Sequence, residues 1–171
     1  MESLKRYMDR CLEFITISLF LVMVAVTMWQ VIARYILNDP SSLTEEFVRF
    51  SLIWLSMLSG AYVVGKKGHI AITLLSDRLN HGKKLVLDIV IQTSFLVFGA
   101  MIMVYGGFRA VSISMAQISP SLNIPMGFVY LSLPVSGALI ILYSAINIIT
   151  LIKERANSDQ VQLSNLNKKS G

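Results

Sequence analysis

The lysine and arginine residues of this chain are sorted by position. Twelve of the fifteen fall before the first long apolar run, between the second and third, or after the fourth. Positive residues resist translocation and collect at the cytoplasmic ends of membrane helices. The pattern therefore predicts a chain that crosses a membrane four times and has both termini in the cytoplasm. The twelve are Lys5, Arg6 and Arg10; Lys66, Lys67, Arg78, Lys83 and Lys84; and Lys153, Arg155, Lys168 and Lys169.

The composition agrees with a lipid environment. Hydrophobic residues make up 54% of the chain and charged residues 15%, against about 25% charged residues in an ordinary soluble domain. The net charge of +5 does not indicate a nucleic-acid partner, because cations beside apolar spans attract the anionic head groups of membrane lipids. The single cysteine, Cys11, excludes an internal disulfide.

The predicted fold class is an all-α integral membrane protein with four tilted transmembrane helices in one domain, residues 1–155. The 20 uncharged residues from Phe14 to Ala33 predict an uncleaved first span, since the apolar region of a signal peptide has about 7–15 residues. The polar residues 156–171 predict a disordered cytoplasmic tail. The four spans are expected at about 12–33, 47–64, 85–108 and 126–152.

The connection between the second and third spans predicts a short helix that lies on the inner leaflet. In the run from His69 to Leu79, the side chains of Ile72, Leu75 and Leu79 fall on one helical face, as in interfacial amphipathic helices. The same connection is the inner-face basic loop, which consists of Lys66, Lys67, His69, Arg78, Lys83 and Lys84.

Small residues in the second span indicate close helix packing. Ser56 with Gly60, and Ala61 with Gly65, are spaced four residues apart, a pattern that lets membrane helices approach closely. In the fourth span, Pro134 is expected to kink the helix or to leave a backbone carbonyl without its hydrogen bond.

Four charged residues, Arg34, Glu45, Glu46 and Arg49, form a predicted periplasmic rim where the first two spans emerge. Glu46 has two readings: part of an ion site, or an acid at a helix start that pairs with Arg34 or Arg49. We favour the second reading, because anions at helix N-termini are common. The rim charges either brace the turn at Asn38-Asp39-Pro40 or help to dock another protein.

The sequence contains no residue set that indicates an enzyme. His69 and His81 both lie in the inner loop, so a haem held by two histidines within the spans is excluded. No acidic residue lies at the centre of a span, where a cation or proton path would need one. We therefore expect no catalytic, cofactor, metal or substrate site in this chain.

Several short motifs follow one another along the chain. They are Trp29-Gln-Val-Ile-Ala-Arg34-Tyr35, Thr44-Glu45-Glu46, Trp54 with Gly60-Ala61, Gly68-His69-Ile70, and Ile124-Pro125 with Tyr130 and Leu133-Pro134-Val135. Together they resemble the small membrane subunit of tripartite ATP-independent periplasmic (TRAP) transporters over about residues 12–152. Two positions depart from the family pattern: Leu43 replaces a frequent aromatic residue, and Thr73 replaces a frequent acid.

The resemblance implies a three-part importer in a bacterial inner membrane. In this family a periplasmic substrate-binding protein captures an organic acid, such as a dicarboxylate, a keto acid or sialic acid. A large multi-span permease subunit holds the substrate and sodium sites and moves as an elevator. The small subunit packs against the large subunit as a scaffold. The chain itself would then need no cofactor, and it would contribute to sodium symport only by supporting the large subunit.

Two other functions are less compatible with the sequence. A self-sufficient small exporter acting as a homodimer would want an acidic residue in the middle of the first span, and residues 14–33 contain none. A quinone-linked membrane oxidoreductase would need cysteine pairs or histidines within the spans, and both are missing.

The charge asymmetry makes the topology testable. With Cys11→Ser as background, His81→Cys should be cytoplasmic and Asn123→Cys periplasmic. In intact cells, an impermeant thiol reagent should label the cysteine at position 123 and spare the one at position 81. Labelling at position 81 would reverse the predicted orientation.

Overall fold

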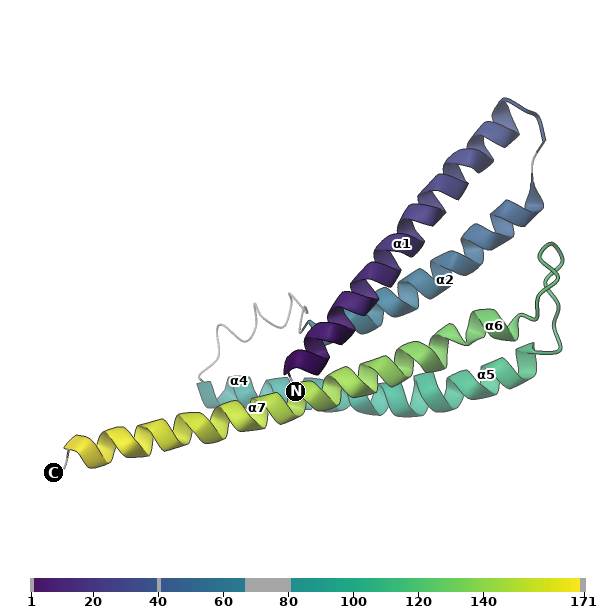
Figure 1. The fold of residues 1–171 in the computed structure, drawn as a ribbon. Helices are drawn as coiled ribbons and strands as arrows, with labels where there is room; N and C mark the ends of the chain where they lie inside the picture. The colour runs from purple at the N-terminus through teal and green to yellow at the C-terminus, as the bar shows by residue number, and fades with distance from the viewer. Residues whose placement is uncertain (1, 40, 67–80, 170–171) are drawn as a thin grey trace.

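The computed structural model describes the backbone of residues 2–39, 41–66 and 81–169, and the side chains of residues 5–39, 41–66 and 87–153. This part of the chain is helical and contains no β-strand. The elements are α1 (Glu2–Tyr35), α2 (Ser42–Gly65), α4 (His81–Phe98), the π-helix η1 (Gly99–Gly106), α5 (Gly107–Ser114), α6 (Gly127–Tyr130) and α7 (Ser132–Lys169). Figure 1 labels the α-helices.

Four stretches are long and apolar enough to cross a membrane, which confirms the predicted all-α class with four spans. The third exceeds the predicted range 85–108, because the helix does not end at Gly106-Gly107 but runs through η1 into α5. The predicted helix at His69–Leu79 lies outside the described residues. The four stretches are Lys5–Tyr35, Ser42–Gly65, Leu87–Ser114 and Gly127–Lys153.

The C-terminal helix α7 extends past the predicted fourth span. Helix α7 continues to Lys169. Residues 152–169 contain neither proline nor glycine, the two residues that disfavour a helix interior most. Polarity alone therefore does not end the helix here.

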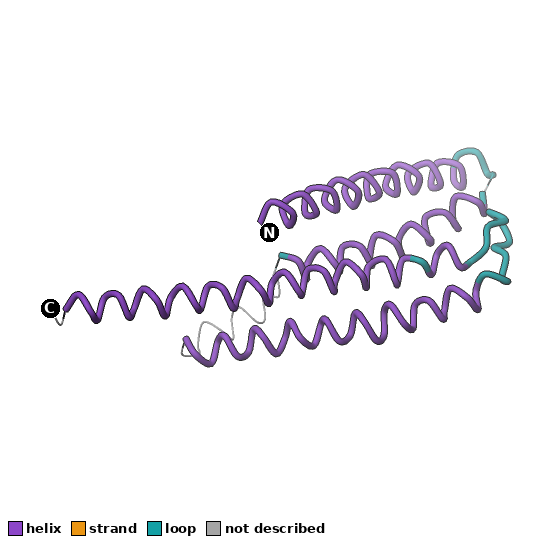
Figure 2. The backbone as a smooth tube through the Cα atoms, turned by 60° about the horizontal axis from the view of Figure 1, so that its bottom comes forward, coloured by secondary structure: helices purple, strands orange, loops and turns teal. Residues whose placement is uncertain are grey.

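The helices lie in an open row. Helix α2 packs between α1 and α7, and α7 also packs against α4, η1 and α5. Figure 2 shows this order, with α1 at one side and the α4–η1–α5 helix at the other. Helix α1 is therefore an outer member of the row, and of its described side chains only those of Leu12 and Ala33 are buried.

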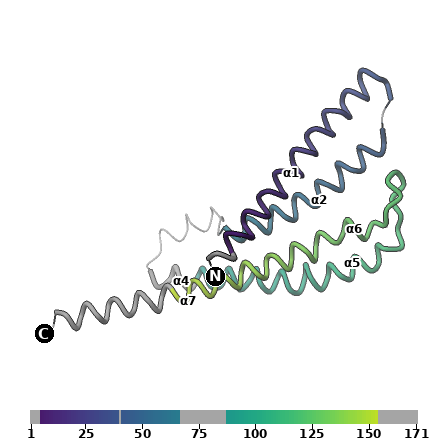
Figure 3. The backbone as a smooth tube through the Cα atoms, in the orientation of Figure 1, coloured from purple at the N-terminus to yellow at the C-terminus, as the bar shows by residue number. Residues whose placement is uncertain are grey.

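The two turns that the sequence predicts lie at the same end of the molecule (Figure 3). We call this end, with the α1–α2 turn and residues 115–126, the outer end, and the opposite end the inner end. Each turn contains an asparagine with a φ of 53°, Asn38 and Asn123, a left-handed conformation in which asparagine is enriched. The membrane side of each end stays a prediction.

Helix α7 is the centre of the row and approaches its neighbours closely. A Cβ atom added at Gly65 of α2 would lie 2.6 Å from the ring of Tyr143, whose side chain is fully buried. On the other side, a Cβ atom at Gly107 would lie 2.8 Å from Cδ of Pro134. Helix α6 ends just before Pro134, and Leu131 separates it from α7. This interruption is where the proline predicts one.

The other small residues of α2 face different ways. Ala61 is fully buried and belongs to a core with Val64, Met103 and Ile140. Ser56 is exposed and its hydroxyl donates to the carbonyl of Leu52. Gly60 is also exposed, and a Cβ atom there would meet nothing within 4 Å. Within this chain, Ala61 and Gly65 therefore make the close contact, whereas a contact at Ser56 or Gly60 stays a prediction that requires another protein.

Gly65 and Gly60 form a matched pair for testing this packing. Gly65→Val should lower the stability of the purified subunit by about 1–3 kcal/mol, the usual cost of overpacking, because the new side chain meets the ring of Tyr143. Gly60→Val should change stability by less than about 1 kcal/mol, the scale of its helix propensity alone. Thermal unfolding in detergent measures both. Equal losses for the two variants would contradict the assigned contact.

Candidate functional site

A buried carboxylate ties α2 to the outer turn of the other half of the molecule. Oε2 of Glu46 accepts the backbone N–H of Ser121 at 2.9 Å and of Leu122 at 3.0 Å. The side chain of Glu46 is only 8% exposed. Both donors belong to the turn after α5, which folds back through the bonds from Ser119 N–H to Ile124 and from Met126 N–H to Gln117. We call this contact the outer clamp.

The outer clamp corrects the expected partner of Glu46. Neither Arg34 nor Arg49 pairs with it; Arg49 instead bonds Glu45 at 3.1 Å on the exposed surface of α2. Arg34 and Glu45 line a cavity of about 120 Å³ between α1 and α2. Three of the four predicted rim residues thus lie near the exposed α1–α2 turn, whereas Glu46 contacts the turn after α5. Exposed pairs such as Arg49–Glu45 stabilise little.

A second set of polar contacts joins three helices at the inner end. The hydroxyl of Tyr143 donates to Oδ1 of Asp9 at 2.8 Å, and Nζ of Lys5 donates to Oδ1 of Asn147 at the same distance. Nδ2 of Asn147 donates to the backbone carbonyl of Val64 at 3.4 Å. We call these contacts the inner clamp. Tyr143 and Asn147 were missed from sequence, although two large polar side chains in an apolar span are a usable signal.

The basic inner loop is described only at its first residue and along the start of α4. Lys66 is exposed, and its Nζ lies 5.2 Å from the centroid of the Tyr62 ring. A hydrogen bond with the neighbouring Tyr62 raises the pKa of Lys66 above its ordinary value. Lys67, His69 and Arg78 lie outside the described residues, and the side chains of Lys83 and Lys84 are likewise not described.

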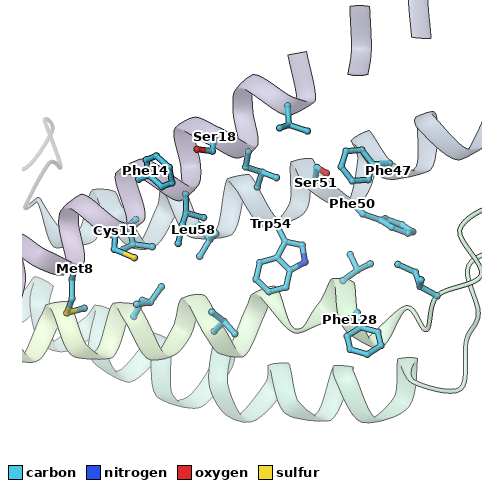
Figure 4. A pocket seen from close by; sticks show the side chains of 18 of the residues that line it. Met8, Cys11, Phe14, Ser18, Phe47, Phe50, Ser51, Trp54, Leu58 and Phe128 are labelled. Carbon is cyan, nitrogen blue, oxygen red and sulfur yellow. The ribbon is translucent and has the colours of Figure 1, made fainter. Parts of the chain in front are cut away.

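Between the two clamps, α1, α2 and the α6–α7 segment enclose an open groove of about 910 Å³. Figure 4 shows side chains from α1 and α2 facing those from α6 and α7 across it. Hydrocarbon and aromatic surface dominates the lining. Characteristic residues are Cys11, Phe14 and Ser18 from α1, Phe50 and Trp54 from α2, and Phe128 from α6.

The spans offer little ionic chemistry. Among the described residues, no group of histidine, cysteine, aspartate or glutamate could hold a metal ion. The acidic residues within the four stretches all lie near an end: Asp9, Glu13, Glu45, Glu46 and Asp88. Glu46 is engaged in the outer clamp. The arrangement can therefore pack against apolar surfaces, but it presents no charged group at mid-depth to an ion or an anionic solute.

Removal of the outer clamp should destabilise the protein more than removal of the exposed ion pair. Glu46→Ala leaves two backbone N–H groups without their acceptor, so we expect a loss of about 1–3 kcal/mol and faster proteolysis of residues 117–126. Glu45→Ala, the control, should cost less than about 1 kcal/mol. Thermal unfolding and limited proteolysis in detergent measure these effects. A Glu46→Ala variant as stable and as protease-resistant as the control would disprove the clamp.

Comparisons with known proteins agree with this architecture. The family model "Tripartite ATP-independent periplasmic transporters, DctQ component" matches residues 23–154, most of the chain. The sialic acid TRAP transporter small permease protein SiaQ of Vibrio cholerae is 28% identical over 153 residues, which cover 90% of this chain and 88% of that protein. A putative TRAP transporter small permease protein of Haemophilus influenzae is 28% identical over 152 residues, or 89% of this chain and 92% of that protein.

A further relative has a different organisation. The isethionate TRAP transporter permease protein DctMQ of Oleidesulfovibrio alaskensis is 28% identical over 126 residues, which cover 70% of this chain but only 20% of that protein. These matches confirm the resemblance seen in the sequence motifs. With its four membrane-spanning helices, this chain is a multi-pass protein of the bacterial inner membrane and belongs to the DctQ-component family, the small permease subunits of TRAP transporters.

Proposed function

We propose that this chain is the scaffold subunit of a sodium-driven importer that receives an organic acid from a periplasmic binding protein. In this proposal, the large permease subunit carries the substrate and sodium, and the small subunit supports it in the membrane. The chain itself performs no catalysis and holds no cofactor.

The observation that carries the proposal is the absence of Asp, Glu, His, Lys or Arg at mid-depth among the described residues of the four spans. A charge at the bilayer centre costs at least about 2.5–3.5 kcal/mol. A path for an anion or for sodium therefore needs polar groups at that depth. Here the charged groups Glu46, Asp9 and Lys5 lie near the ends of the spans, where the two clamps use them to hold helices together.

The relatives support a division of labour between subunits. Proteins named for sialic acid and for isethionate are both 28% identical to this chain. Equal similarity to proteins named for two different acids is what we expect if another subunit selects the substrate. The DctMQ relative, in which the matching segment is one fifth of the protein, supports a large permease as the direct neighbour of this chain.

Reconstitution into proteoliposomes tests the proposal. The small subunit alone should give no sodium-dependent uptake of any organic acid. Addition of its large permease subunit, sodium and a loaded binding protein should produce uptake, and omission of the small subunit should abolish it. Gln92→Ala should leave sodium dependence intact, because no sodium site is assigned to this chain. Robust uptake by the small subunit alone would refute the scaffold function and favour a self-sufficient transporter.

A further inference from the structure

We propose that the groove between α1, α2 and the α6–α7 segment seats a transmembrane helix of the large permease subunit. The inference rests on the proposed function and deepens it, because it assigns the face by which this chain contacts its partner. The groove is the concave side of the row α1–α2–α7, with α2 as its floor and α1 and α7 as its walls.

The length of the groove favours an element that spans the membrane. Along α1 the lining extends from Tyr7 to Val22, a distance of about 22 Å at 1.5 Å per residue, and beyond α1 it continues to Leu122 and Ile124 in the outer turn. The hydrocarbon core is about 30 Å thick. The groove thus covers most of the membrane thickness and crosses the midplane, whereas a lipid molecule occupies a single leaflet.

The chemistry of the lining fits an apolar helix. Membrane helices associate through van der Waals packing and approach one another at small residues. The groove supplies large side chains such as Phe50 and Trp54, and it has a small one at Ser18 of α1. Among the described residues, no Asp, Glu, Lys or Arg lines the groove. A helix that enters it would therefore remove no charged side chain of the described residues from water.

Two observations identify the source of the helix. Helix α1 packs mainly on α2. On its groove side Leu12 is buried against Leu58 and Tyr143, but further along the helix Phe14, Ile15 and Val22 line the groove and leave apolar surface exposed. The DctMQ relative contains a segment that matches this chain within a permease about five times as long as that segment. A large permease therefore provides the spanning helices that a single small subunit lacks.

Photocrosslinking in membranes that contain both subunits tests this assignment. We would place p-benzoylphenylalanine at Phe14 and at Phe128, on opposite walls of the groove, and at the control Tyr105, which is 72% exposed on η1. The proposal expects light-dependent adducts of the small with the large subunit from both groove positions. Adducts with a second small subunit or with lipid alone would overturn it, as would an adduct from position 105 in place of the groove positions.

A groove-filling variant provides an independent measurement. Ser18→Trp should lower the amount of large subunit that co-purifies on the order of tenfold, since overpacking costs enough for such a change. Ser94→Trp, on the exposed surface of α4, should leave co-purification within about twofold. Thermal unfolding of each isolated variant separates loss of docking from loss of folding. Equal co-purification of Ser18→Trp and the parent would overturn the groove assignment.

The unaltered chain contains a reactive side chain in the groove. A test with this side chain needs no substitution and therefore cannot fail because a variant misfolds. Cys11, its single cysteine, is exposed and lines the groove. Its reaction with N-ethylmaleimide should slow on the order of tenfold when the large subunit is bound, since tight packing excludes the reagent. Equal rates in a complex that co-purifies would overturn the groove assignment and leave the proposed function intact. Failure of the two subunits to co-purify would instead contradict the proposed function itself.

Discussion

In a lipid environment, helices gain little from hiding leucine side chains from one another, because the surrounding hydrocarbon is equally apolar. Close approach at small residues and hydrogen bonds must then hold them. In this protein both features converge on α7. Its Tyr143 ring lies on Gly65 of α2, and its Pro134 lies on Gly107 of α5. The row of helices depends on these contacts, because α1 and the α4–η1–α5 helix lie on opposite sides of the row.

The two clamps fix the ends of this arrangement in different ways. The outer clamp uses one carboxylate to hold two backbone N–H groups of a turn. The inner clamp uses side chains of α1 and α7 and a backbone carbonyl of α2. Hydrogen bonds to a charged group are worth about 1.5–3 kcal/mol net each, so the clamps both add stability and fix the positions of the helices relative to one another. Between them, the groove can stay open without loss of the overall arrangement.

Much of the fold could be predicted from the sequence, because the responsible signals are local. Apolar runs of about 20 residues define the spans, and Asn38-Asp39-Pro40 defines a turn. The partner of Glu46 could not be predicted this way, since its N–H donors lie 75 and 76 residues further along the chain. The exposed position of Gly60 and the open row of helices could not be predicted either. A small residue permits a close contact, but the sequence does not show which helix makes that contact.

The π-helix η1 affects how this protein should be aligned with others. Its hydrogen bonds join residues i and i+5 rather than i and i+4, so each turn takes in more residues than an α-helical turn. Buried positions there recur every fourth residue, at Gly99, Met103, Gly107 and Val111, and stay directed at α7. A homologue with one residue fewer between Gly99 and Gly106 would have an ordinary α-helical turn in place of the wider π-helical turn. In such a homologue, the same sides of α4 and α5 would still face α7. Gaps in this segment therefore carry structural meaning.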